Sequence, residues 1–529
     1  MKRVFALLLI PAILCGLLCG CGKQDEEEYV PTGNALLLEG MEPEDLIQEE
    51  EEIDELMLAY DPSRSMNPLI GNSISNRVLF SLMYQGLFAY NSRNVTVPIL
   101  CSRYRVSPDN TIYTFYVDSN ATFSDGSRVT IDDVFETYAA AKNSNYYKGR
   151  FTHIVEIKKN EDGSVTLYLD TAYENLPLLL DIPILKASQV EDDYPLGTGP
   201  YAFMKSANGA TLNRVTNWWC ETEISTNARV ISLLETGSQA EIRDAFEFGD
   251  LDLACSNPML DSFAEYRCDY ELWTCENGIF LYLGVNVLYS PYFKDESGKL
   301  RKALTYAIDR ETINNDYYRG LGQVSTLPTS PGSPYYNSSL ASRYEYDPMK
   351  FLDAIAGFQI PKEENGGVRK LRLLVNSDDS ARLRAARAIA AHLSELSIPT
   401  GTLEYGSSGP GTTYEQVLQA GTFDMYLGQT KLPANNDLSE FFKGYGTLRY
   451  GGITDGTLLN MTREALANSG IYYNLNKMVV EDAKIIPIMF GCYYIYAERG
   501  QLLDLTPSRD NVFYYSIGKT MDDIWERTN

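Results

Sequence analysis

The stretch DNTIYTFYVDSNATFSDGSRVTIDDVFETY, residues 109–138, decides the fold of the chain around it. Residues 112–117 turn alternate side chains to opposite faces, which predicts a half-buried strand. Gly126 then supplies a turn, because glycine reaches positive φ without a Cβ clash. Thr130 and Asp133 have the spacing of a capping box, so a helix is expected to begin there. The stretch predicts a strand, a turn and a capped helix, a common unit that alone names no function.

The composition indicates a globular chain with more than one domain. The chain has 529 residues, 44% hydrophobic and 22% charged, and this length exceeds what one hydrophobic core covers. The formal net charge of −26 argues against nucleic acid as a partner, because phosphate binding needs a basic face. Fourteen acidic residues and one lysine fall within residues 22–55. Such runs are normally solvated, so residues 21–55 are expected to form an acidic tether.

The first twenty residues have the pattern of an export signal. Two basic residues, 2–3, precede an apolar run over residues 4–18, and Cys21 follows. The pattern looks like a bacterial lipobox, in which the signal is cleaved before a cysteine that receives a lipid. We therefore expect residues 1–20 to be a lipoprotein signal peptide and lipidated Cys21 to anchor an extracytoplasmic protein to the cell membrane, in the periplasm or on the outer face. The alternative is a transmembrane anchor, for which the apolar run is short.

Cysteine and histidine usage limits the possible chemistry. The cysteines beyond the export segment are Cys101, Cys220, Cys255, Cys268, Cys275 and Cys492. None are spaced C-x-x-C, so a zinc site of that kind has no support. Cys255, Cys268 and Cys275 are close enough to pair locally, and buried free thiols are the alternative. The two histidines, His153 and His392, nearly exclude histidine-based triads and H-E-x-x-H sites, so we expect neither an enzyme nor a metal or cofactor site.

Three further segments have a readable periodicity. Residues 75–87 have the apolar spacing of a helix that Gly86 ends. Residues 280–287 form a continuous apolar run, which predicts a buried strand. The segment 300–311 is expected to be one helix, because five apolar positions share one helical face: Leu300, Ala303, Leu304, Ala307 and Ile308.

Motifs spread along the chain resemble those of a known family. They include F-S-D-G (123–126) followed by T-x-x-D-V (130–134), G-T-G-P-Y (197–201), R-x-A-L-x-Y-A-I-D-R-E (301–311) and E-D-A-x-I-I-P (481–487). Their types and order resemble the family 5 extracellular solute-binding proteins, the dipeptide- and oligopeptide-binding branch of the ABC importers. The sequence departs from the family pattern at Arg128 and Lys484, where proline is usual.

The resemblance implies an α/β chain with the class II periplasmic-binding fold. Two main α/β domains would be joined by hinge strands and supplemented by a small extra α+β lobe. The expected parts are main domain I (56–74, 196–277 and 489–529), the small lobe (75–195) and main domain II (278–488).

The resemblance also implies a function and a site. The chain would capture a solute, most simply a short peptide, between its domains and deliver it to an ABC permease and ATPase complex. Asp437, with its neighbour Asn436, lies where the family places an aspartate that takes the ligand's α-amino group. The alternative for Asp437 is a solvent-facing Asx turn. Alternatives for the function are an oligosaccharide or metal chelate as ligand, or a sensor or scaffold lipoprotein.

Overall fold

The computed structural model describes residues 27–29, 56–90, 95–207, 209–220, 228–259, 265–295, 297–409, 411–499, 505, 507 and 509. The expected signal peptide, Cys21 and most of the acidic tether lie outside these residues. In the described ranges, no helix combines the length and apolar character that a membrane span needs.

A five-stranded antiparallel sheet carries the stretch with which the sequence analysis began. Its strand order is β1-β5-β6-β8-β7, and β6 is the expected strand, Ile112–Val117. The other strands are β1 (Glu27–Tyr29), β5 (Cys101–Val106), β7 (Ile154–Lys159) and β8 (Ser164–Leu169). Helix α2 (Ile131–Ala141) begins at the capping box, where the Thr130 amide donates to Asp133 at 2.7 Å. Residues 95–190 of the expected lobe 75–195 contain β5–β8 and α2. From here on, the name small lobe refers to residues 95–190.

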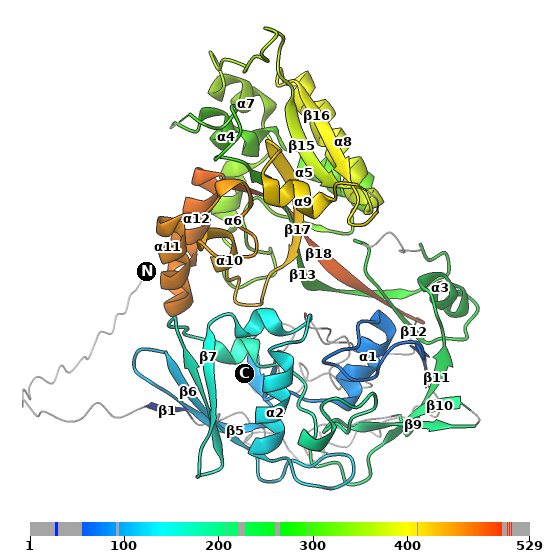
Figure 1. The fold of residues 1–529 in the computed structure, drawn as a ribbon. Helices are drawn as coiled ribbons and strands as arrows, with labels where there is room; N and C mark the ends of the chain where they lie inside the picture. Colours follow the sequence, from blue (N-terminus) through cyan, green and yellow to red (C-terminus); the bar gives the residue numbers. More distant parts are fainter. Residues whose placement is uncertain are drawn as a thin grey trace, which may run out of the picture.

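A second sheet of eleven strands runs through the rest of the molecule (Figure 1). Its order is β16-β15-β17-β13-β18-β12-β2-β11-β10-β9, with β14 paired to β18. We call β14–β17 with α4–α12 the upper half, and β2 and β9–β12 with α1 and α3 the lower half. The lower strands are β2 (Leu56–Tyr60), β9 (Tyr201–Ser206), β10 (Gly209–Arg214), β11 (Val230–Glu235) and β12 (Leu253–Ser256). The upper strands are β14 (Gln323–Val324), β15 (Leu371–Asn376), β16 (Thr400–Tyr405) and β17 (Met425–Lys431).

Two long strands, β13 (Glu271–Val285) and β18 (Ile485–Ala497), join the halves. They pair with each other along both halves, β17 adds to the upper part of β13, and β12 adds to the lower part of β18. The pairing shifts register between Glu276 and Phe280, where Gly278 has φ +74°. Such a bulge bends a strand locally and increases its twist, so the two halves meet where the backbone changes direction.

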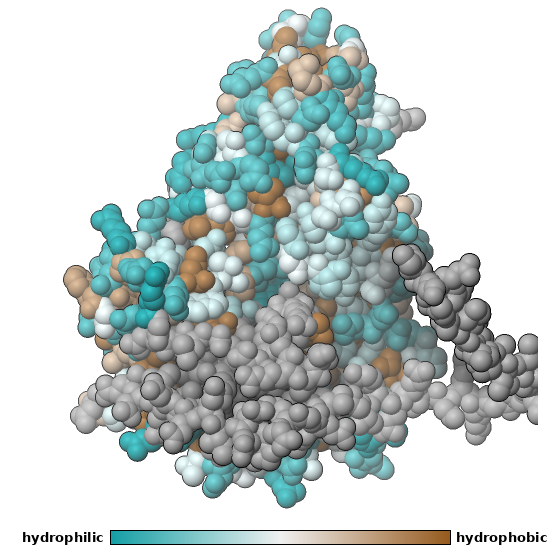
Figure 2. Space-filling view, turned by 180° about the vertical axis from the view of Figure 1, so that it is seen from behind, coloured by the Kyte–Doolittle hydropathy of each residue, from teal (hydrophilic) through white to brown (hydrophobic). Residues whose placement is uncertain are grey.

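Helices cover both faces of the upper sheet. Successive residues of β13 face opposite sides, and the apolar side chains on each side are buried against helices. Leu281 and Leu283 pack in one core with α5 and α8, whereas Phe280 and Tyr282 pack in another with α9, α10 and α12. The helices are α4 (Lys299–Ala303), α5 (Arg310–Tyr318), α6 (Ser338–Ala341), α7 (Pro348–Ala354), α8 (Ser380–Glu395), α9 (Tyr414–Ala420), α10 (Ser439–Phe442), α11 (Gly456–Ala467) and α12 (Tyr472–Asp482). On the face drawn in Figure 2, the described surface is mostly hydrophilic, with small separate apolar patches.

The small lobe and the lower half share one hydrophobic core. That core contains Leu58 of β2 and Ile231 of β11 together with Phe115 of β6 and Val134 of α2. Helices α1 (Ile74–Met83) and α3 (Gln239–Glu247) pack on the lower sheet. Since a close-packed core transmits displacement, the small lobe is expected to move with the lower half as one body.

Three expectations from the sequence need correction. Helix α1 ends at Met83 and not at Gly86, because Tyr84 is already extended, with its hydroxyl bonded to the Met66 and Pro195 carbonyls. The segment 300–311 is not one helix. It breaks after a 3₁₀ turn, since the Asp309 carboxylate accepts the Thr312 amide and starts α5 instead. The strand predicted at 280–287 forms as the upper part of the longer β13, but it ends at Val285.

The local disulfides considered from the sequence do not form. Cys255 and Cys268 are free thiols, and every pairing among the three neighbouring cysteines would use one of these two. Burial raises the pKa of the Cys255 thiol to about 12, so it stays protonated at neutral pH.

Candidate functional site

A cavity of about 520 Å³ lies between the small lobe and the upper half. One wall is residues 145–152, which precede β7, and the other is the segment 430–448, which begins with the last two residues of β17. Arg509 also lines it. The volume is within the range of about 300–1,000 Å³ that is usual for small-molecule sites.

The cavity lining carries both signs of charge. Its cations are Lys148 and Arg150 on the small lobe, Lys431 at the end of β17, and Arg509, whereas its acids are Asp437 and Glu440. The guanidinium groups have carboxylate partners, because Arg150 pairs with buried Asp181 and Arg509 with Glu276. Lys431 Nζ lies 3.0 Å from the Tyr146 hydroxyl, and Lys148 Nζ lies 3.2 Å from the Asn145 amide oxygen. The lining can therefore meet a ligand that carries charges of both signs.

Asp437 lines this cavity from a tight turn. Its Oδ1 accepts the Ser439 amide at 2.8 Å and the Ser439 hydroxyl, which is an Asx turn. The turn itself was considered from the sequence, but its exposure to solvent is wrong, because the side chain is only 4% exposed. A carboxylate in such surroundings needs a compensating partner.

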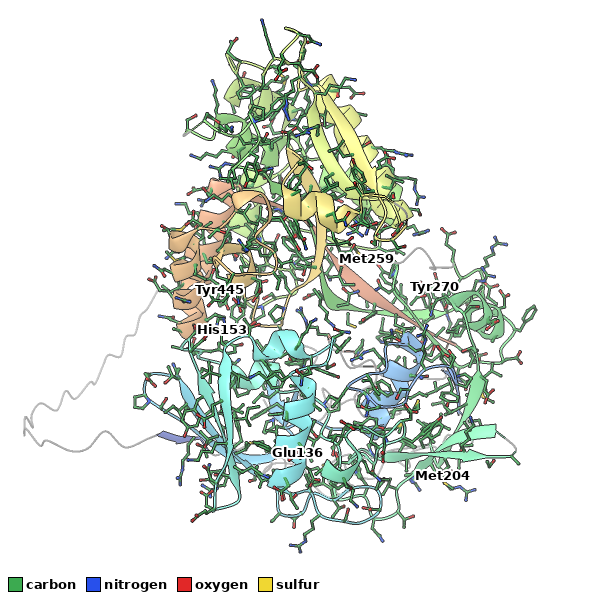
Figure 3. The ribbon with its side chains drawn as sticks, viewed as in Figure 1. Glu136, His153, Met204, Met259, Tyr270 and Tyr445 are labelled. Carbon is green, nitrogen blue, oxygen red and sulfur yellow. The ribbon has the colours of Figure 1, made fainter. Side chains whose placement is uncertain are left out.

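His153 of the small lobe is that partner. Its Nε2 lies 3.0 Å from Asp437 Oδ2, and its Nδ1 lies 2.9 Å from Oδ1 of Asp170, which follows β8. Figure 3 shows His153 at the edge of the small lobe that faces the upper half. An imidazole that donates from both nitrogens is the protonated form. We call Asp170, His153 and Asp437 the histidine bridge.

The pKa directions of the two buried members agree with this pairing. Burial alone would lower the pKa of His153, but the hydrogen bonds and charges of Asp437 and Asp170 outweigh it and raise that pKa above its ordinary value. Burial alone would raise the pKa of the Asp437 carboxyl, but His153 and Ser439 hold it below its usual value. Both groups are therefore charged in the bridge at mildly acidic pH.

Asn436, the other candidate residue, faces a different space. It has φ +54°, and its amide donates to the Thr329 hydroxyl at 3.0 Å. It lines a smaller cavity of about 30 Å³, together with Tyr90 and Ser330. The two neighbouring candidates thus divide between two cavities, and only Asp437 lines the larger one.

Further polar contacts join the small lobe to the upper half. The Glu174 amide donates to the Leu466 carbonyl at 2.9 Å, and its carboxylate accepts the Ser469 amide at 2.7 Å. With the histidine bridge and the Tyr146–Lys431 contact, they hold the small lobe against the upper half. Among the described residues, no group of three metal-ligating side chains is arranged to hold a metal ion.

The sequence analysis missed the role of His153. It used the rarity of histidine to exclude catalysis and did not connect this residue with Asp437, from which 284 positions separate it. No local pattern around either residue marks the pair, because the contact forms only where the small lobe packs against the upper half.

Sequence comparisons match a large part of the chain to known solute-binding proteins. Residues 95–449 match the model for "Bacterial extracellular solute-binding proteins, family 5 Middle". The nickel-binding periplasmic protein of Escherichia coli is 23% identical over 343 residues, which cover 60% of this chain and 64% of that protein. The oligopeptide-binding protein AppA of Bacillus subtilis is 27% identical over 270 residues, 46% of this chain and 48% of that protein. The aligned regions thus span about half to two thirds of these curated relatives.

Solved structures show the same fold over nearly the whole chain. The ABC transporter substrate-binding protein CtaP from Listeria monocytogenes has a TM-score of 0.68 at 17% identity, covering 89% of this chain and 100% of that one. AppA from Bacillus subtilis, solved in complex with a nonapeptide, has a TM-score of 0.60 at 18% identity, covering 88% and 99%. The likeness confirms the class II periplasmic-binding fold. The family model matches two thirds of this chain, and the chain therefore belongs to the family 5 extracellular solute-binding proteins.

Proposed function

We propose that this protein captures short peptides in the cavity beside the histidine bridge and delivers them to a membrane permease of an ABC importer. The observation that carries the peptide assignment is the charge pattern of that cavity. Asp437 lies on its wall with lysines at positions 148 and 431 in the same lining. A peptide with free ends has one ammonium and one carboxylate, so this lining can bind both ends.

Binding would couple to closure of the two halves. The ligand would touch the small lobe, which shares its core with the lower half, and the 430–448 segment of the upper half. Because it gains its full contacts only when both walls meet, it favours the closed arrangement. The bulge at Gly278 between β13 and β18 would absorb the backbone change.

Anchoring through lipidated Cys21 remains part of the proposal and would keep the protein near its permease.

The test is to identify what the purified chain carries. The protein is isolated without added ligand, examined by native mass spectrometry, then denatured and its released small molecules identified. Short peptides released only on denaturation support the proposal. A sugar or a metal chelate would retain the solute-binding role and reject the peptide assignment.

A thermal-shift screen gives a second measure if the isolated protein carries nothing. A ligand present at one hundred times its dissociation constant stabilises the folded state by about 2.7 kcal/mol. Peptide, oligosaccharide and chelate panels are therefore compared at matched concentration. A shift with none of the three would favour a sensor or scaffold role over transport.

Matched variants test which residues of the cavity bind the ammonium and which bind the carboxylate of the peptide. Asp437→Asn should weaken binding of free-amine peptides, because a charged hydrogen bond contributes about 1.5–3 kcal/mol, on the order of 10- to 150-fold in affinity. Lys431→Gln and Lys148→Gln should instead weaken peptides with a free carboxylate and leave amidated peptides nearly unchanged. Equal losses for both peptide types in every variant would reject the assignment of ends.

A further inference from the structure

The carboxylate of Asp437 already holds a cation, and that cation belongs to the protein. One oxygen faces His153 Nε2 at 3.0 Å, and the other accepts the Ser439 amide at 2.8 Å. With 4% of the side chain exposed, no ligand atom can approach Asp437 along the line that the imidazole occupies. A ligand cation that takes the position of the imidazole at Oδ2 must therefore displace the histidine ring.

The ring can move without leaving its charge unpaired. The His153 backbone is held in the small lobe, because its carbonyl accepts the Asp170 amide at 3.0 Å. The side chain also contacts the Asp170 carboxylate, which is 47% exposed. The other titratable or charged groups beside the ring are Arg150 and Tyr173, which line the same small cavity of about 10 Å³. On leaving Asp437, the imidazolium keeps Asp170 and gains water.

We propose that His153 is an internal competitor of cationic ligand groups, because such a group must replace the imidazolium at Asp437. This rests on the proposed function and adds a specificity residue to it. A ligand ammonium restores the charge pair that Asp437 loses, whereas a neutral ligand end would leave a buried carboxylate uncompensated. The exchange also releases one of the contacts between the small lobe and the upper half.

The competition should depend on pH with a definite sign. While His153 is protonated it opposes the ligand cation, and once pH rises through its raised pKa the neutral ring competes less. Affinity for cationic ligands should therefore increase with pH until the ligand amine itself loses its proton, which for an α-amine is near about 8. Ligands without a cation should show no such increase.

The experiment compares two histidine variants of the full chain, since the sequence has only two histidines. The variants are His153→Gln and, as the matched control, His392→Gln. The probes are a tripeptide library with free α-amines and the same library N-acetylated, titrated at pH 5.5. We expect His153→Gln to bind the free-amine library about tenfold more tightly than wild type, with acetylated peptides unchanged and His392→Gln equal to wild type.

A spectroscopic readout separates displacement from indirect effects. In His392→Gln labelled with ¹³C in its imidazole, the remaining signal reports His153 alone. Free-amine peptides should shift it and lower its pKa toward the ordinary value. Unchanged or weaker free-amine binding by folded His153→Gln, or an unchanged titration of His153 on peptide binding, would overturn the inference.

Failure of the proposed function has a different outcome. Binding of neither library to wild type would reject the peptide assignment. Methylammonium chloride then serves as the probe of the exchange, and no change in the His153 signal at saturating methylammonium would overturn the inference as well.

Discussion

Two connections between the upper and lower parts of this molecule can be compared, and they differ in kind. Strands β13 and β18 join the halves covalently and by a backbone ladder whose upper part is buried on both faces. The histidine bridge joins the small lobe to the upper half by one imidazole between two carboxylates. The first connection contains a glycine bulge and is held by backbone hydrogen bonds, which do not titrate, whereas the second depends on the protonation of His153. The two connections should therefore respond differently to a change of pH.

The largest expected effect is at the hinge. Gly278 has φ +74°, and an added Cβ would lie 2.9 Å from the Leu432 carbonyl oxygen and meet the Arg509 side chain. Positive φ costs a non-glycine residue about 1–2 kcal/mol, and overpacking adds about 1–3 kcal/mol. Gly278→Ala should therefore lower the free energy of unfolding by about 2–5 kcal/mol, measured by urea denaturation.

A second glycine provides the matched control for the hinge. Gly163 has φ +79° in the turn between β7 and β8, but a Cβ there would meet nothing within 4 Å. Gly163→Ala should cost only the backbone term, about 1–2 kcal/mol. Equal losses in both variants would mean that crowding at the hinge contributes nothing.

The second effect is at the histidine bridge. Charged hydrogen bonds in proteins contribute about 1.5–3 kcal/mol, so His153→Ala and Asp437→Ala should show a coupling energy of that size at pH 5.5. A double-mutant cycle by urea denaturation measures it. The pair of His153→Ala with Asp170→Ala should couple less, because Asp170 is half exposed. Coupling with Asp437 below about 0.5 kcal/mol would show that the bridge adds no stability.

A smaller effect is the pH dependence of that coupling. The pKa of His153 is raised on folding, so its contribution is complete below the unfolded value of about 6.5 and is lost as pH rises through the folded value. The pKa of Asp437 is lowered, so its contribution is complete above about 3.9 and is lost as pH falls through the folded value. The coupling energy should therefore be greatest between about pH 4 and 6.5 and should fall on both sides. A coupling that is constant from pH 5 to 9 would contradict a protonated bridge.

The smallest effect concerns an ion pair on the surface. Arg387 Nη2 lies 2.6 Å from Glu404 Oε2, with the two side chains 57% and 29% exposed. Solvent screening makes such exposed pairs weak despite their short distance. Arg387→Ala should change the urea midpoint only slightly, and 0.5 M salt should remove most of the difference. A loss as large as that of Asp437→Ala would undo the contrast between exposed and buried charge pairs.

Local features of the fold could be predicted from the sequence because local contacts decide them. Residues 112–117 form β6, and Thr130 with Asp133 caps α2, since alternation and capping act over a few positions. The prediction of one helix over 300–311 was wrong for an equally local reason. Asp309 starts a new helix, although the apolar spacing alone indicated that the first helix continues. The ordered motifs also identified the family correctly, and with it a binding protein in place of an enzyme.

The site could be predicted only in part. The resemblance implied a ligand contact for Asp437, with an Asx turn as the alternative; the turn forms, and the ligand contact stays a prediction. Its burial and its partner did not follow, because both arise when the small lobe packs against the upper half. His153 has no local feature that marks it, and a contact between two loops so far apart in the chain depends on the whole fold. The different cavity of Asn436 results from the positive φ of one residue, which no periodicity reveals.

The pairing of β12 with β18 also has a consequence for biosynthesis. Strand β12 pairs on one side with β2, near the start of the described chain, but its neighbour on the other side is Tyr494–Ala497 of β18. Because synthesis proceeds from the N-terminus, nearly the whole protein must be made before that sheet edge is covered. Until then β12 presents unpaired backbone groups that another chain could join. Because this strand pairing joins residues far apart in the chain, we expect the protein to fold slowly. We also expect its folding to depend on protection of β12 from other chains during synthesis.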